Sequence, residues 1–151
     1  MKEEDKQYLS QVGMYLADLF YNQNKMNEEF VPYELALRLK ELGFDKSTFG
    51  GWCHPFNNHK PYLQLNQEGE YDITAPTFSQ AFRWFREKHN LFGKIYITNF
   101  GADEYSFNIY DLYEEKYKYE NFIAASMSYA GTFETYEEAE LACLEKLIEI
   151  V

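Results

Sequence analysis

The strongest constraint on the fold of this chain is a pair of helix-start signals that bracket an alternating stretch. Thr77-Phe-Ser-Gln80 and Thr135-Tyr-Glu-Glu138 match the capping box, in which a threonine hydroxyl and a Gln or Glu side chain satisfy free amides at a helix start. We predict that the first helix ends near His89-Asn90 and that the second runs to Val151. The inward face of the first helix carries Phe78, Ala81, Phe82 and Phe85 at helical spacing.

Between these helices the sequence alternates with a period of two, which is typical of half-buried strands. Residues 94–100 and 105–110 alternate in this way, and the turn residues 101–103 between them suit a hairpin. The second stretch places Tyr105, Phe107 and Ile109 on one face. Residues 122–130 are expected to form a third strand. We therefore predict an α+β fold that ends in a helix, a three-stranded antiparallel sheet and a helix.

The N-terminal half predicts two helices followed by an irregular segment. Apolar residues recur at helical spacing over 5–22, and a second helix starts at Pro32 and stops at Gly43, a left-handed cap on which Phe44 can fold back. Glycine, proline and asparagine interrupt residues 45–76, where short strands over 49–53 and 62–65 are expected. With 151 residues the chain is expected to form one domain, 1–151, with a weak subdivision at 45–76.

Negative charge is concentrated at the C-terminal end. The whole chain has a net charge of −11, of which residues 101–151 contribute −9, from 12 acidic and 3 basic side chains. The candidate docking residues are therefore acidic: Asp111, Glu114, Glu115, Glu137, Glu138 and Glu140. Carboxylates in the first turn of a helix are favoured by its dipole, and acidic surfaces promote solubility. The other interpretation of these acidic residues is that they form a surface that docks a basic protein partner.

The same charge argues against nucleic acid as a partner. A basic, aromatic helix with Arg83, Arg86 and Lys88 could contact phosphates, but these cations can equally pair with nearby carboxylates. The predicted order of elements is shared with double-stranded-RNA-binding domains, which hold phosphates with lysines at the start of the last helix. Glu137, Glu138 and Glu140 stand at that position and would repel phosphates, so no nucleic-acid binding is predicted.

Enzyme and metal signatures are absent from the sequence. It contains no phosphate-binding glycine loop, nucleophile elbow, His-Glu-x-x-His or calcium loop. Cys53, His54 and His59 are the one cluster with metal-ligand chemistry, but adjacent residues rarely face one ion, so no metal and no cofactor are predicted. If the chain is an enzyme with an unrecognised site, His54, His59 and Asp103 are the first residues to replace by alanine.

The expected compartment is the cytoplasm. The first residues lack the apolar core of a signal peptide, no apolar run is long enough to span a bilayer, and the two cysteines form no disulfide framework. Cys143 lies in an apolar helical pattern and is expected to be buried. The many tyrosines of residues 105–129 favour either a sheet with aromatic faces or an interface, and self-association through such a face is one hypothesis.

Three runs resemble uncharacterised small proteins encoded by bacteriophages and prophages of gut bacteria. They are residues 30–44 (FVPYELALRLKELGF), 73–88 (ITAPTFSQAFRWFREK) and 136–148 (YEEAELACLEKLI). The resemblance implies an accessory protein that works in a bacterial cytoplasm, and it transfers no catalytic residue. The favoured hypothesis is a non-enzymatic protein that acts through protein–protein contacts. The alternatives are an acidic decoy that mimics nucleic acid for a DNA-binding host protein, and an enzyme.

Overall fold

A computed structural model describes residues 13–14, 27–53, 60–65, 71–99, 104–111, 116–120 and 132–151. The chain divides into two compact units, Met1–Phe30 and Val31–Val151. Of the first unit, residues 13–14 and 27–28 are helical, and the rest of the helix expected over 5–22 lies outside the described residues. Residues 45–76 belong to the second unit. The single domain expected over 1–151 stays a prediction.

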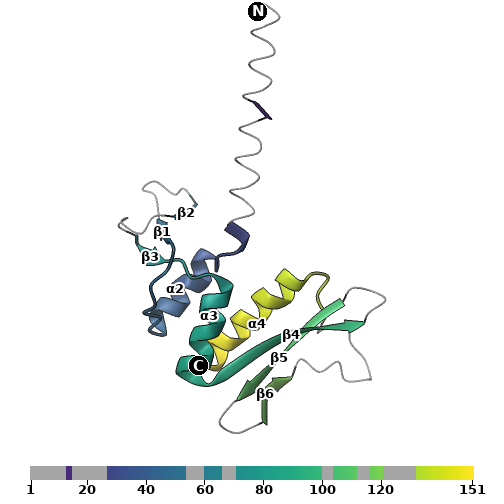
Figure 1. The fold of residues 1–151 in the computed structure, drawn as a ribbon. Helices are drawn as coiled ribbons and strands as arrows, with labels where there is room; N and C mark the ends of the chain where they lie inside the picture. Colours follow the sequence, from purple (N-terminus) through teal and green to yellow (C-terminus); the bar gives the residue numbers. More distant parts are fainter. Residues whose placement is uncertain are drawn as a thin grey trace, which may run out of the picture. The chain divides into compact units, whose positions relative to one another are not determined.

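The second unit mixes helices with two antiparallel sheets, so the expected α+β class is confirmed at this level (Figure 1). One sheet has the strand order β2-β1-β3 and the other β4-β5-β6. The helices are α2 (Tyr33–Glu41), α3 (Phe78–Trp84), the π-helical turn η1 (Phe85–His89) and α4 (Tyr136–Ile150). The strands are β1 (Gly51–Cys53), β2 (Tyr62–Gln64), β3 (Ile73–Thr74), β4 (Leu91–Asn99), β5 (Glu104–Asp111) and β6 (Lys116–Glu120).

Helix α2 ends at the glycine expected from the sequence. Gly43 has φ of +91°, and its N–H donates to the Lys40 carbonyl while the Phe44 N–H donates to the Leu39 carbonyl. This is the Schellman arrangement, and buried Phe44 folds back on buried Leu39. Trp52 of the small sheet contacts the start of this helix: its indole N–H donates to the carbonyl of Val31, which precedes the helix, at 3.0 Å, and its ring packs against the Tyr33 ring. Its strands β1 and β2 lie within the short stretches expected, whereas β3 was not expected.

Helix α3 begins with the complete capping box centred on Thr77. Its last residues widen into η1, and Asn90 then ends the turn with φ of +58°. Trp84 and Phe85 are almost fully buried at this junction. The inward face expected for this helix did not include Trp84, which the structure places in the core, where its ring packs against Phe44 and Phe85.

The larger sheet is built on a long hairpin of β4 and β5. Its register pairs Gly93 with Ile109, Ile95 with Phe107 and Ile97 with Tyr105. Because directly opposed residues share a face, these pairs form the face on which α4 packs, and Phe107 and Ile109 are buried there.

The third strand, β6, pairs with β5 over Lys116–Glu120. The strand expected over 122–130 lies outside the described residues. Beyond that segment Phe133 rejoins the sheet by exchanging both backbone hydrogen bonds with Tyr105, at 2.9 and 2.8 Å. The described residues that pair with β5 on this side, Lys116–Glu120 and Phe133, therefore lie before and after the segment 122–130 that alternation predicted as the third strand.

Candidate docking surface at the start of helix α4

The capping box at the start of α4 assigns one of the predicted docking residues to a structural task. The Thr135 hydroxyl accepts the Glu138 N–H at 3.1 Å, and the Glu138 carboxylate accepts the N–H groups of Glu134 and Thr135 at 3.1 and 3.4 Å. Glu138 therefore satisfies free N–H groups at the start of its own helix, as the capping-box pattern in the sequence predicted. It contributes less to an outward-facing site than Glu137 and Glu140.

Tyr136, the first residue of α4, is a fixed aromatic ring on the surface. It is 45% exposed, and its ring forms a T-shaped pair with the Tyr105 ring, with centroids 6.2 Å apart and an interplanar angle of 88°. Tyr105 is itself held in the sheet by its two backbone hydrogen bonds to Phe133. The tyrosine pair thus presents aromatic surface to solvent with little freedom to move.

Two carboxylates accompany this tyrosine pair. The pKa of Tyr136 is raised, chiefly by partial burial, then by Glu140, with smaller contributions from Cys143 and Glu137. Both glutamates therefore lie close enough to act on the phenol. Glu137 is exposed and forms no hydrogen bond or ion pair within the described part of the chain. We call Tyr105, Tyr136, Glu137 and Glu140 the tyrosine–glutamate surface.

The remaining predicted docking residues do not join this surface. Asp111 ends β5, opposite Leu91 and Lys116, whereas Tyr105 stands near the start of the same strand. Six residues at about 3.4 Å each separate these positions by roughly 20 Å. Glu114 and Glu115 lie outside the described residues. The acidic group that the sequence suggested is therefore divided, and Asp111 is at the far end of the strand.

The exposed side of α4 carries further acidic residues away from the tyrosines. Glu145 and Glu149 are exposed and follow Glu138 at helical intervals, so they continue along one side of the helix. Lys146 is the one cation of α4, and its ammonium group lies 3.0 Å from the Glu149 carboxylate. We call Glu138, Glu145 and Glu149 the acidic stripe.

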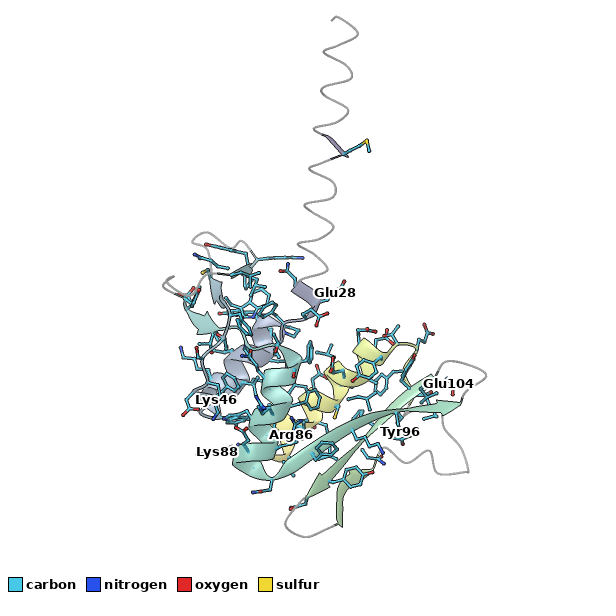
Figure 2. All side chains as sticks on the ribbon, in the orientation of Figure 1. Glu28, Lys46, Arg86, Lys88, Tyr96 and Glu104 are labelled. Carbon is cyan, nitrogen blue, oxygen red and sulfur yellow. The ribbon has the colours of Figure 1, made fainter. Side chains whose placement is uncertain are left out.

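The cations of α3 and η1 are largely occupied. Glu87 lies 3.6 Å from the Arg83 guanidinium and 3.5 Å from the Lys46 ammonium. The guanidinium of Arg86, a residue labelled in Figure 2, lies over the Phe92 ring at 5.7 Å from the ring centroid. The interpretation that these cations pair with nearby carboxylates is thus confirmed for Arg83, whereas Arg86 contacts an aromatic ring instead. A groove beside Glu87 has a volume of about 280 Å³, which is smaller than a usual ligand site, and both basic and acidic side chains line it.

His89 is a half-buried titratable residue of this region. Its ring packs against Trp84 and Phe85, with centroid distances of 4.7 and 5.7 Å. Its Nε2 atom is buried and has no hydrogen-bond partner among the residues that the structure describes. Burial chiefly, and then the neighbouring Lys88 charge, lower the pKa of His89. This environment favours the neutral imidazole.

Of the residues considered for metal or enzyme chemistry, only Cys53 lies among the described residues. His54, His59 and Asp103 lie outside the described residues, and Cys53 is half-buried with its thiol 3.3 Å from the Gln64 side-chain oxygen. Over the described ranges, no three His, Cys, Asp or Glu side chains group together as metal ligands would. The absence of a bound metal stays a prediction.

No described helix is both long enough and apolar enough to cross a bilayer. Comparison of the chain with protein-family models, curated proteins and solved structures gives no significant match. The candidate surface therefore rests on the geometry of this chain alone. Sequence reasoning found Glu137 and Glu140 but missed Tyr136, although an aromatic residue at the first position of a capped helix, between a threonine and two glutamates, was visible.

Proposed function

We propose that this protein is a non-enzymatic binding protein that captures a basic segment of a protein partner on the tyrosine–glutamate surface. One observation carries the proposal: an exposed tyrosine, held by a second tyrosine, lies beside two carboxylates, one of them exposed and unpaired within the described part of the chain. Aromatic surface is enriched at protein interfaces, and carboxylates add selectivity for cations.

Arginine is the side chain that best complements such a surface. Its planar guanidinium can stack on a tyrosine face while its N–H groups pair with a carboxylate in a forked geometry. A tyrosine is a neutral phenol at physiological pH, and the pKa of Tyr136 is raised still further, so this residue offers its ring rather than a third anion. Lysine lacks the planar fork, so we expect arginine-containing segments to bind more tightly than lysine-containing ones of equal charge.

The setting we propose is the cytoplasm of a bacterium, with a host protein as the partner. The resemblance of three sequence runs to small phage and prophage proteins supports this setting. Enzyme activity has no described constellation of residues in its favour.

A defined probe tests the proposal directly. Binding of a fluorescent peptide of alternating arginine and glycine, and of its lysine counterpart, is measured by anisotropy at several salt concentrations. We expect the arginine peptide to bind more tightly, and Glu137→Gln with Glu140→Gln to weaken it by up to about tenfold. Tyr136→Ala should weaken it about two- to fivefold through loss of stacking.

The matched control changes the same number of charges on the same helix. Glu145→Gln with Glu149→Gln removes two exposed carboxylates that lie more than two helical turns beyond Tyr136. If both double variants weaken the peptide equally, or if arginine and lysine peptides bind alike, the tyrosine–glutamate surface is not the site. Unchanged binding in Tyr136→Ala would contradict the stacking role.

The acidic stripe favours one second candidate, a decoy that presents carboxylates in place of phosphates. Glu138, Glu145 and Glu149 follow one another along the exposed side of α4. A decoy would compete with duplex DNA for a basic host protein and would lose affinity steeply with salt. It would depend on Glu145 and Glu149 at least as strongly as on Glu137 and Glu140, which is the reverse of the result expected above.

A further inference from the structure

Strand β4 forms one edge of the larger sheet. The strand order is β4-β5-β6, and β4 is nine residues long (Figure 1). Within the part of the chain that the structure describes, no backbone hydrogen bond joins the outer side of β4 to another element. Such an edge is a template for pairing with another strand.

The backbone geometry identifies which residues offer their groups at this edge. Tyr105 exchanges its N–H and C=O with Phe133, so these groups point away from β4. Its opposite residue, Ile97, is therefore in a non-hydrogen-bonded pair and directs its own N–H and C=O outward. The direction of the backbone N–H and C=O groups alternates along a strand. Those of Ile95 therefore also point outward, whereas those of Tyr96 point toward β5.

The residues whose backbone groups point outward lie in an accessible and nearly uncharged stretch of β4. Ile97 is 41% exposed, and Lys94 is exposed and is the one charged residue of β4. Toward the start of the strand, Gly93 is closely approached by the Phe82 and Cys143 side chains, and a bulge interrupts the register between Ile97 and Asn99. The stretch available for pairing is therefore residues 94–98.

We infer that a second copy of this chain pairs with β4 through residues 94–98, in antiparallel orientation about a two-fold axis at Tyr96. In this register Ile95 of one copy lies opposite Ile97 of the other, and their outward N–H and C=O groups form hydrogen-bonded pairs. Lys94 lies opposite Thr98, so the lysines do not face each other. The exposed Ile97 side chain is covered by an isoleucine.

Charge is the reason that the partner is a second copy rather than a foreign basic strand. Two copies with a net charge of −11 repel each other over most of their surface, but β4 contains no carboxylate. The contact therefore lies where repulsion between copies is weak. A basic segment would instead be drawn to the glutamates of α4. The inference does not depend on the proposed function, because self-association is measured without any basic peptide.

A matched pair of variants at one position tests the backbone contact. Ile97→Ala and Ile97→Pro both remove the exposed side chain, but only proline removes the outward N–H. Analytical ultracentrifugation of the full chain, from low micromolar to several hundred micromolar, should show a monomer–dimer equilibrium for the wild type. Ile97→Pro should weaken the dimer about tenfold or more relative to Ile97→Ala, because two hydrogen bonds per dimer are lost.

A wild-type chain that stays monomeric over this range overturns the inference, and so does a dimer that tolerates proline and alanine equally. Circular dichroism checks that Ile97→Pro is folded. If it is not, hydrogen exchange of the wild type replaces it. Protection of the Ile95 and Ile97 amides should rise with protein concentration, whereas the Tyr96 amide, which faces β5, serves as the internal reference. Protection of Ile95 and Ile97 that is independent of concentration also overturns the inference.

Discussion

Replacing Gly93 by alanine should destabilise the fold, because this glycine lies where three elements converge. A methyl group built on its backbone would lie 2.7 Å from the Cys143 sulfur in α4 and 2.7 Å from a ring carbon of Phe82 in α3. Ordinary van der Waals contacts at such a carbon are 3.4–4 Å. Both helices pack on the same face of the sheet, so shifting one of them leaves the other clash in place.

The expected loss of stability follows from two opposing effects. Overpacking a well-packed core costs about 1–3 kcal/mol. Alanine also restricts the unfolded chain more than glycine does, which returns about 0.4–1 kcal/mol. We therefore expect Gly93→Ala to lower the free energy of unfolding by about 1–2 kcal/mol. For a chain of this length, that corresponds to a fall in Tm of about 2–8 °C.

Thermal and urea unfolding followed by circular dichroism measure this loss. The control is Gly13→Ala, where the added methyl group meets nothing within 4 Å. A double-mutant cycle with Cys143→Ala measures the coupling between the two positions. We expect the loss of unfolding free energy caused by Gly93→Ala to be smaller in the Cys143→Ala background, by about 0.5 kcal/mol or more, because the sulfur that the added methyl group meets is removed. An unchanged or higher Tm for Gly93→Ala, or no coupling to Cys143, would refute the described convergence.

Three further predictions follow from the same packing. Thr77→Ala and Thr135→Ala should each destabilise the protein by about 0.5–2 kcal/mol in urea titrations, and two unchanged midpoints would show that the caps contribute nothing. Because burial raises the pKa of Cys143 to about 12, a thiol reagent at pH 8 should modify Cys53 in the native protein and Cys143 after unfolding; fast native labelling of Cys143 argues against its burial. The lowered pKa of His89 means that the unfolded state binds a proton more readily, so stability should fall as the pH drops below the ordinary histidine value of 6.5. A His89→Gln variant should show a smaller fall over that window, and an identical pH profile would exclude this linkage.

The element boundaries were predictable where the signal is local. The threonines of both capping boxes and the left-handed Gly43 form hydrogen bonds with residues three positions away, and Phe44 with one five positions away, so neighbouring residues contain all the necessary information. The inward face of β5 followed equally from alternation, since Phe107 and Ile109 are buried as expected, although Ser106 on the opposite face is buried as well. Burial of Cys143 was likewise predicted from its apolar surroundings in the helix.

The candidate site was less predictable because its members come from separate elements. Glu137 and Glu140 could be named from the sequence, but the acidic composition also grouped them with Asp111, which the register places at the other end of β5. The partner of Tyr136 is Tyr105, more than thirty residues earlier in the chain. No local periodicity reports such a contact.

The sequence by itself determined where three helices start or stop and which face of the hairpin is buried, because those choices depend on hydrogen bonds and side-chain spacing within a few residues. Only the tertiary structure decided that β6 pairs over Lys116–Glu120, that Trp84 belongs to the core and that Gly93 must lack a side chain. Each of these depends on atoms brought together from distant parts of the chain. Packing of such atoms selects among local preferences that the sequence leaves equally open.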